Sequence, residues 1–124
     1  MKNRIFCGYA LSGAIVLLAA CAQKEISFKA DVQPLLKQYC VECHTAGGQG
    51  VEKSGLLVTS YESLMKGTKF GAIIKPGDTL TSAMIMLVEG RVDASIKMPH
   101  GKASLPREKI DLLKRWVEQG AKNN

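Results

Sequence analysis

The stretch Cys40-Val41-Glu42-Cys43-His44 holds the residues of this sequence best suited to chemistry. Two thiols separated by two residues, followed directly by an imidazole, form the attachment pattern for a c-type haem. Each cysteine sulfur adds to one vinyl group of the porphyrin, and the two intervening residues let one helical turn span that edge. His44 then lies under the iron and offers a ring nitrogen as the proximal ligand. The pattern predicts one covalent haem on Cys40 and Cys43, with His44 as an axial ligand.

A Cys-x-x-Cys pair has other uses, because thiol-exchange proteins and half zinc sites share the spacing. The neighbouring His44 favours haem attachment over both. The alternative is an accessory lipoprotein whose Cys40 and Cys43 exchange thiols, or bind zinc together with His44 and, as a distant fourth ligand, His100. Such a protein would carry no haem.

The second axial position of the iron takes a methionine, a histidine, a small molecule or nothing. Met98 lies in a polar loop and is followed by Pro99, which stiffens its backbone, so a thioether there suits ligation. His100, two residues further on, is the alternative ligand and would lower the reduction potential. Three other methionines lie in apolar helical surroundings, where methionine usually serves as packing: Met65, Met84 and Met86.

Residues 1–20 have the organisation of a bacterial signal peptide. Lys2 and Arg4 give a positive start, and residues 5–20 are uncharged and mostly apolar. This apolar run is shorter than the roughly 20 residues that a membrane-spanning helix needs. An uncleaved membrane anchor is the alternative interpretation.

The segment Leu18-Ala19-Ala20-Cys21 resembles the lipobox of bacterial lipoproteins. The resemblance implies that Cys21 is acylated and becomes the first mature residue, which would hold the protein on a membrane. Residues 21–27 then form a lipidated tether, and its six residues after Cys21 reach at most about 20 Å. Ala22, next to the lipid-bearing residue, favours the outer membrane.

Cysteine use and chain length indicate a small domain built around the haem. Cys7 falls in the leader, Cys21 takes lipid, and Cys40 and Cys43 take haem, so no cysteine remains for a structural disulfide. Of the 124 residues, 124 − 20 = 104 remain in the mature chain, a size that buries only a modest core. A covalently attached porphyrin would supply the missing apolar centre. We therefore expect one domain over residues 28–124.

The charge is mildly basic. The whole chain carries a formal charge of +6, and without Lys2 and Arg4 there are 15 Lys and Arg against 11 Asp and Glu, or +4. The lysines are spread along the sequence and form no basic stripe, which excludes a nucleic-acid-binding signature. We interpret them as a solvated surface that aids docking to an acidic redox partner.

Apolar periodicity and turn residues predict four helices joined by long loops. The expected helices span residues 28–39, a short segment opened by a capping box at Thr59–Glu62 and ending at Gly67, residues 80–89, and a last helix from Pro106 to Gly120. Asp31 and Asp78 are the expected N-caps of the first and third helices. Residues 45–55 are rich in glycine and are expected to form a loop. Trp116 of the last helix is expected to pack against Phe28 and Val32.

Several segments carry a family resemblance. They are Phe28 with Asp31–Leu36, Cys40–His44, Gly55-Leu56, Lys75–Asp78 with Ser82, Met98-Pro99, and Leu112–Ala121. Together they resemble the single-haem cytochrome c domains also found in planctomycete-type cytochromes, over nearly the whole mature chain. The resemblance implies a small all-α, class I-like fold wrapped around one covalent haem, with His44 and Met98 as axial ligands. His100 departs from the pattern, because many relatives have a second proline there.

We therefore expect a lipid-anchored electron carrier on the periplasmic side of a bacterial membrane, with redox proteins as partners. Such a carrier transforms no substrate and is not an enzyme. The alternative is a haem-based sensor, or a haem protein that binds a diatomic molecule or peroxide, with a labile sixth ligand.

Overall fold

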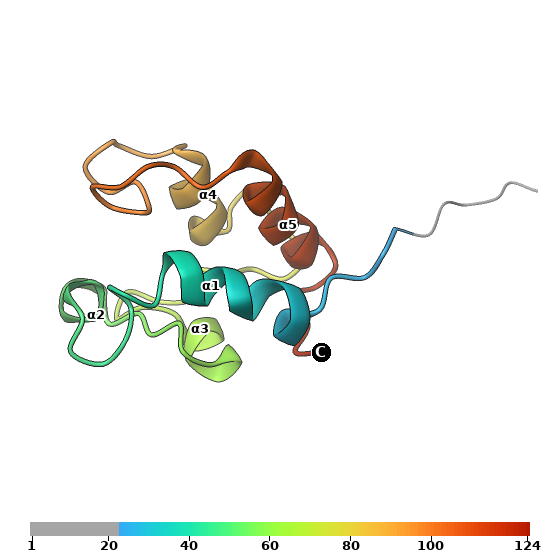
Figure 1. The fold of residues 1–124 in the computed structure, drawn as a ribbon, viewed down its shortest axis with the longest axis horizontal. Helices are drawn as coiled ribbons and strands as arrows, with labels where there is room; N and C mark the ends of the chain where they lie inside the picture. Colours follow the sequence, from blue (N-terminus) through green and yellow to red (C-terminus); the bar gives the residue numbers. More distant parts are fainter. Residues whose placement is uncertain (1–22) are drawn as a thin grey trace, which may run out of the picture.

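The computed structural model describes residues 23–124, so the expected signal peptide and the lipidation site Cys21 lie outside the described residues. Five α-helices and one π-helical segment form the described chain: η1 (Phe28–Val32), α1 (Gln33–Tyr39), α2 (Gln49–Ser54), α3 (Tyr61–Lys66), α4 (Ala83–Glu89) and α5 (Arg107–Glu118) (Figure 1). Residues 23–124 contain isolated β-bridges and no β-strand, which confirms the all-α class. Over the same residues, no helix is both long and apolar enough to cross a bilayer.

The first helix occupies the predicted residues but begins in an unexpected way. Ser27 is the N-cap, because its hydroxyl accepts from the Ala30 N–H at 3.1 Å, and the Asp31 carboxylate accepts from the Ser27 N–H at 2.9 Å. The prediction of Asp31 as N-cap was therefore wrong by one turn. The opening turn is π-helical, and its wider ring lies just before Pro34, which has no N–H to donate to the preceding turn.

The starts of α3 and α4 also fall later than predicted, whereas their ends at Gly67 and Gly90 are confirmed. The capping box of α3 pairs Ser60 with Ser63 rather than using Thr59 and Glu62. Asp78 caps only an isolated turn by accepting from the N–H groups of Leu80 and Thr81, both at 2.9 Å. Leu80 is consequently 73% exposed and stands outside the helix.

Helix α2 lies inside the stretch that was expected to be a loop. None of its residues is buried, so its sequence shows no apolar periodicity. Gly48 precedes it, and Gly55 ends it with a left-handed backbone (φ 75°). The prediction of a loop over residues 45–55 was wrong for this reason.

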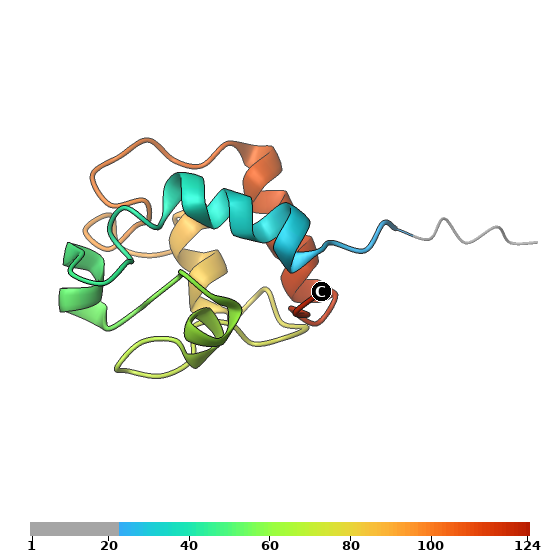
Figure 2. The ribbon, with the colours of Figure 1, turned by 60° about the horizontal axis from the view of Figure 1, so that its bottom comes forward.

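The main core lies where the start of the first helix meets the last helix, as Figure 2 shows for η1 and α5. Trp116 is fully buried, and its ring centroid lies 5.7 Å from that of Phe28, which confirms the predicted contact between them. Tyr61 meets Phe28 edge-on at 5.2 Å and donates its hydroxyl to the Ala121 carbonyl at 2.8 Å. The Trp116 indole N–H donates to the Lys122 carbonyl at 3.0 Å.

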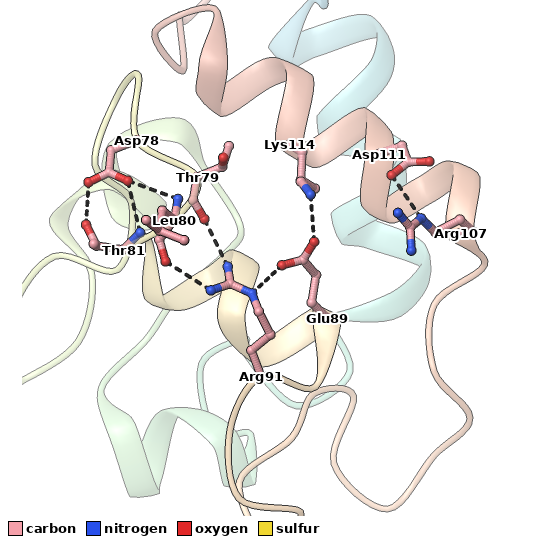
Figure 3. Close-up of polar contacts among 9 residues, drawn as sticks. All are labelled: Asp78, Thr79, Leu80, Thr81, Glu89, Arg91, Arg107, Asp111 and Lys114. Carbon is pink, nitrogen blue, oxygen red and sulfur yellow. Dashed lines mark hydrogen bonds and ion pairs between the residues drawn. The ribbon is translucent and has the colours of Figure 1, made fainter.

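A charged network joins the end of α4 to α5 (Figure 3). The Glu89 carboxylate accepts from Lys114 Nζ of α5 at 2.8 Å and from Arg91 Nε at 2.6 Å. The other guanidinium nitrogens of Arg91 donate to the carbonyls of Thr79 and Leu80, at 3.0 and 3.1 Å. The network therefore fixes the point at which the chain leaves α4 and enters loop 91–104.

Replacing Trp116 by Phe should lower the free energy of unfolding by about 1–3 kcal/mol, because the Lys122 carbonyl loses its partner and the core loses volume. Urea unfolding followed by circular dichroism would measure this change. The exposed Phe70, replaced by Leu, serves as the control and should alter stability by less than about 0.5 kcal/mol. Equal effects of the two substitutions would contradict the assignment of Trp116 to the centre of the core.

Replacing Glu89 by Gln should destabilise the protein by about 1 kcal/mol at neutral pH, after allowance for solvent screening. Hydrogen bonds and charge from Lys114 and Arg91 lower the pKa of Glu89. Its stabilising contribution is thus complete above the ordinary carboxyl pKa and is lost as the pH falls through the lowered one. Stability measured from pH 7 to pH 3 should show the variant converging with the wild type.

The more exposed pair of Arg107 and Asp111 on α5, drawn in the same figure, provides the control. Asp111→Asn should cost no more than about 0.5 kcal/mol at neutral pH. A pH-independent cost of Glu89→Gln would show that the substitution acts through packing instead of charge.

Candidate haem site

A cavity of about 390 Å³ with predominantly apolar walls lies at one end of the molecule. Its lining includes Cys40, Cys43 and His44 from the chain after α1, and Met98 and His100 from loop 91–104. The structure therefore brings together the five residues predicted for attachment and ligation. Both views show α2 and this loop at the end of the molecule opposite the point where the chain enters (Figures 1 and 2).

The attachment motif forms one turn that continues from α1. The N–H of Cys40 donates to the Leu36 carbonyl at 2.9 Å. The N–H groups of Cys43 and His44 both donate to the Cys40 carbonyl, at 3.2 and 3.0 Å. The two thiols and the imidazole are thus carried on a single helical turn, as their spacing predicts.

His44 is only 9% exposed, and its ring is oriented by the backbone. Nδ1 lies 3.2 Å from the Leu56 carbonyl oxygen. Because a carbonyl oxygen only accepts, Nδ1 must carry the proton, and Nε2 keeps its lone pair for a metal. The sequence held no signal for this contact, since its acceptor belongs to the main chain.

Two further contacts hold the same residue. The His44 carbonyl accepts from the Val58 N–H at 3.1 Å, so the extended segment after α2 binds both the backbone and the ring of His44. Gly50 packs directly on the imidazole, because a Cβ atom there would lie 2.6 Å from His44 Cε1. A Cβ atom on Gly48 would lie 2.4 Å from the Cys43 carbonyl oxygen. These glycines let α2 approach the motif closely. The glycines at positions 48 and 50 were the only sequence feature that could have indicated this close contact.

The Cys40 thiol does not have the character of a nucleophile in an exchange pair. Burial, together with a smaller effect of the neighbouring Cys43, raises the pKa of the Cys40 thiol to about 11. A nucleophilic cysteine needs the opposite shift, because the thiolate is the reactive form. Within residues 23–124, no group of three or more His, Cys, Asp or Glu side chains is arranged to hold a metal ion, so the zinc alternative gains no support.

The candidates for the second axial ligand lie on two different elements. The N–H of Met98 donates to the Leu87 carbonyl at 3.1 Å, which ties the loop to the last turn of α4. Met98 is half-buried and His100 is exposed. Met84 of α4 also lines the cavity, whereas Met65 packs against the core without lining it.

Helix α4 contributes to both the cavity wall and the core. Met84, Leu87 and Val88 line the cavity, and Ile85 is fully buried. The high apolar content of this helix, which suggested burial on two sides, is explained by this position.

The mouth of the cavity is lined by charged side chains. Glu42, between the two cysteines, accepts from Lys102 Nζ of loop 91–104, and this contact raises the pKa of Lys102. Lys53 of α2 lies on the same rim. The pair of Glu42 and Lys102 links the attachment motif to the loop that carries Met98.

The residues present fit a c-type haem. The apolar walls suit a porphyrin, and the volume falls within the roughly 300–1,000 Å³ usual for cofactor sites. Cys40 and Cys43 would form the thioether bonds, and the free Nε2 of His44 would bind the iron.

Comparison with known proteins agrees with this geometry. Residues 40–100 match a family model described as planctomycete cytochrome C, and the match runs from Cys40 to His100. No curated protein and no solved structure matches the chain. The match supports a cytochrome c-type domain in this chain, with a c-type haem as its cofactor and electron transfer as its general role.

Proposed function

We propose that this protein is a lipid-anchored, one-electron carrier with a single haem, on the periplasmic side of a bacterial membrane. The observation that carries the proposal is the meeting of Cys40, Cys43, His44 and Met98 on the walls of one apolar cavity. When bound there, a c-type haem supplies an iron that gains and loses one electron. The protein transforms no substrate and is not an enzyme.

His44 is the proximal ligand in this proposal. Its Nδ1–H bond to the Leu56 carbonyl fixes the tautomer and raises the basicity of Nε2. Gly50 and the Val58 N–H restrict movement of the residue from two further directions. A ligand held in this way keeps one geometry in both oxidation states, which suits a carrier.

Met98 is the distal ligand, and His100 is the alternative. Three features support Met98: it is half-buried against the core, its N–H is bound to Leu87 of α4, and it lies within the matched region. His100 also lines the cavity but is more exposed than Met98. Filled axial positions favour electron transfer over binding of a diatomic molecule or peroxide.

The remaining parts of the proposal concern location and partners. Residues 1–20 serve as a lipoprotein signal peptide and Cys21 as the acylated residue, with Ala22 favouring the outer membrane. The partners are redox proteins that approach the cavity mouth, and nucleic acid has no part in the function. In a domain of about 100 residues, with a radius of gyration of about 13 Å, a porphyrin edge is close enough to the surface for such exchange.

Covalent haem is the first test. The full chain, produced in a bacterium equipped to mature c-type haem, should stain for haem on a denaturing gel and contain one haem per chain by its pyridine haemochrome. Replacing both Cys40 and Cys43 by Ser should abolish the stain, because no sulfur then remains to bind a vinyl group. Cys7→Ser, in the leader, is the matched control and should keep it. A colourless wild-type protein would rule out the proposed function.

The distal ligand is tested by the visible spectrum. The ferric wild type should show the far-red band of a methionine–iron bond, and Met98→Ala should remove it. The variant should also lower the reduction potential by roughly 0.1–0.3 V, since methionine favours ferrous iron and axial ligands span ~0.8 V.

His100→Ala is the control and should keep both the band and the potential. Survival of the band in Met98→Ala would exclude Met98 as the ligand. Rapid, complete binding of carbon monoxide by the reduced wild type would support the sensor function in place of the carrier.

A further inference from the structure

The two ends of the described chain are bound together by a set of hydrogen bonds that we call the clasp, formed between residues 24–29 and 119–124. The Gln119 side chain contributes two of them: its Oε1 accepts from the Ile26 N–H at 2.7 Å, and its Nε2 donates to the Lys24 carbonyl at 3.2 Å. Lys122 Nζ adds an ion pair to Glu25 at 2.6 Å.

Asn124 supplies the other half of the clasp. Its Oδ1 accepts from the Phe28 N–H at 2.9 Å, and its Nδ2 donates to the Ile26 carbonyl at 3.3 Å. Its backbone oxygen accepts from the Lys29 N–H at 3.0 Å and from the Ser27 hydroxyl at 2.9 Å. The side-chain amides of Gln119 and Asn124 therefore form hydrogen bonds with main-chain N–H and C=O groups of residues 24–28, as a neighbouring strand would.

The clasp makes most of the expected tether part of the folded domain. Ile26 is 5% exposed and belongs to the core, although it lies before the first helix. Only Ala22 and Gln23 separate Cys21 from Lys24, the first residue bound by the clasp. Three Cα steps span at most about 11 Å, roughly half the reach expected for a free tether over residues 22–27.

The clasp and the cavity mouth lie at opposite ends of the molecule. The chain enters beside α5, whereas α2 and loop 91–104, which line the cavity, lie at the far end in both views (Figures 1 and 2). A domain of this size has a radius of gyration of about 13 Å, so its ends are on the order of 30 Å apart. A link of about 11 Å keeps the clasp end at the bilayer, and a domain that stands on this end holds its far end on the order of 30 Å from the lipid.

We propose that the clasp holds the cavity mouth away from the membrane. The redox partner of this protein is then a protein domain in the aqueous phase and not a carrier dissolved in the lipid. This inference rests on the proposed function, because it requires the lipid at Cys21. It goes further by assigning a direction to the mouth and a physical class to the partner.

The test uses the full-length, haem-loaded lipoprotein in phosphatidylcholine vesicles. Reduction is followed with ascorbate in the water and, separately, with a long-chain quinol confined to the bilayer. A flexible Gly-Ser insertion of about ten residues between Gln23 and Lys24 has a root-mean-square length of roughly 17 Å. The short native link keeps the effective concentration of the bilayer quinol at the cavity mouth low, because the link cannot bring the two together. The insertion should therefore speed reduction by the quinol about tenfold or more. Reduction by ascorbate should be unchanged.

The double variant Gln119→Ala, Asn124→Ala should also speed reduction by the quinol, since it removes the side-chain bonds that hold Lys24, Ile26 and Phe28. Asn123→Ala is the matched control, because Asn123 bonds to the Glu62 side chain outside the clasp. A wild type that accepts electrons from the quinol as fast as the insertion variant would overturn the inference.

Two measurements separate failure of this inference from failure of the proposed function. Mass spectrometry of the mature protein shows whether Cys21 is acylated. An unmodified Cys21 would reject the proposed anchor, and with it the proposed orientation of the cavity mouth relative to the membrane. Hydrogen exchange in solution reports on the clasp itself: the amides of Ile26 and Phe28 should be protected, and the double variant should expose them because it removes their side-chain acceptors. Fast exchange of these amides in the wild type would overturn the clasp whatever the state of Cys21.

Discussion

The hydrogen bond from His44 Nδ1 to the Leu56 carbonyl is the constraint on which the site depends. It decides which ring nitrogen keeps its lone pair, and hence whether the imidazole is available to a metal. The surrounding chain is organised to keep this bond: α2 lies against the motif through Gly48 and Gly50, and the extended segment that follows α2 supplies the acceptor. The proximal side of the site is therefore built from the residues directly after the attachment motif.

The distal side is held by a different part of the molecule. Helix α4 gives one side to the core through Ile85 and another to the cavity through Met84 and Val88. Its last turn binds the Met98 N–H, and the Glu89 network joins it to α5. Helix α4 is thus one of the elements that connect the core at Trp116 to the cavity, together with Leu36 of α1 and Leu64 of α3.

The sequence was sufficient for those features that depend on residue type and spacing. The attachment motif, the buried face of α5 and the glycine ends of α3 and α4 follow from local chemistry, and all lie where they were expected. Helix starts were less predictable, because Thr59, Ser60, Asp78 and Ser82 can all cap and only the folded chain selects among them. Helix α2 was missed since it buries no side chain, and the Leu56 contact was missed since a carbonyl leaves no trace in the sequence.

The close approach of Gly50 to the imidazole has a consequence for the electronic state of a bound haem. A methyl group at this position would lie 2.6 Å from His44 Cε1 and 2.8 Å from both His44 Nδ1 and the Cys43 carbonyl oxygen, so the imidazole or the start of α2 would have to shift. Rotation of an axial imidazole changes the ligand field of the iron while every coordinating atom stays the same. Residue 50 is thus a place where a minimal substitution, through its contact with the imidazole, bears on the orientation of a ligand that it does not replace.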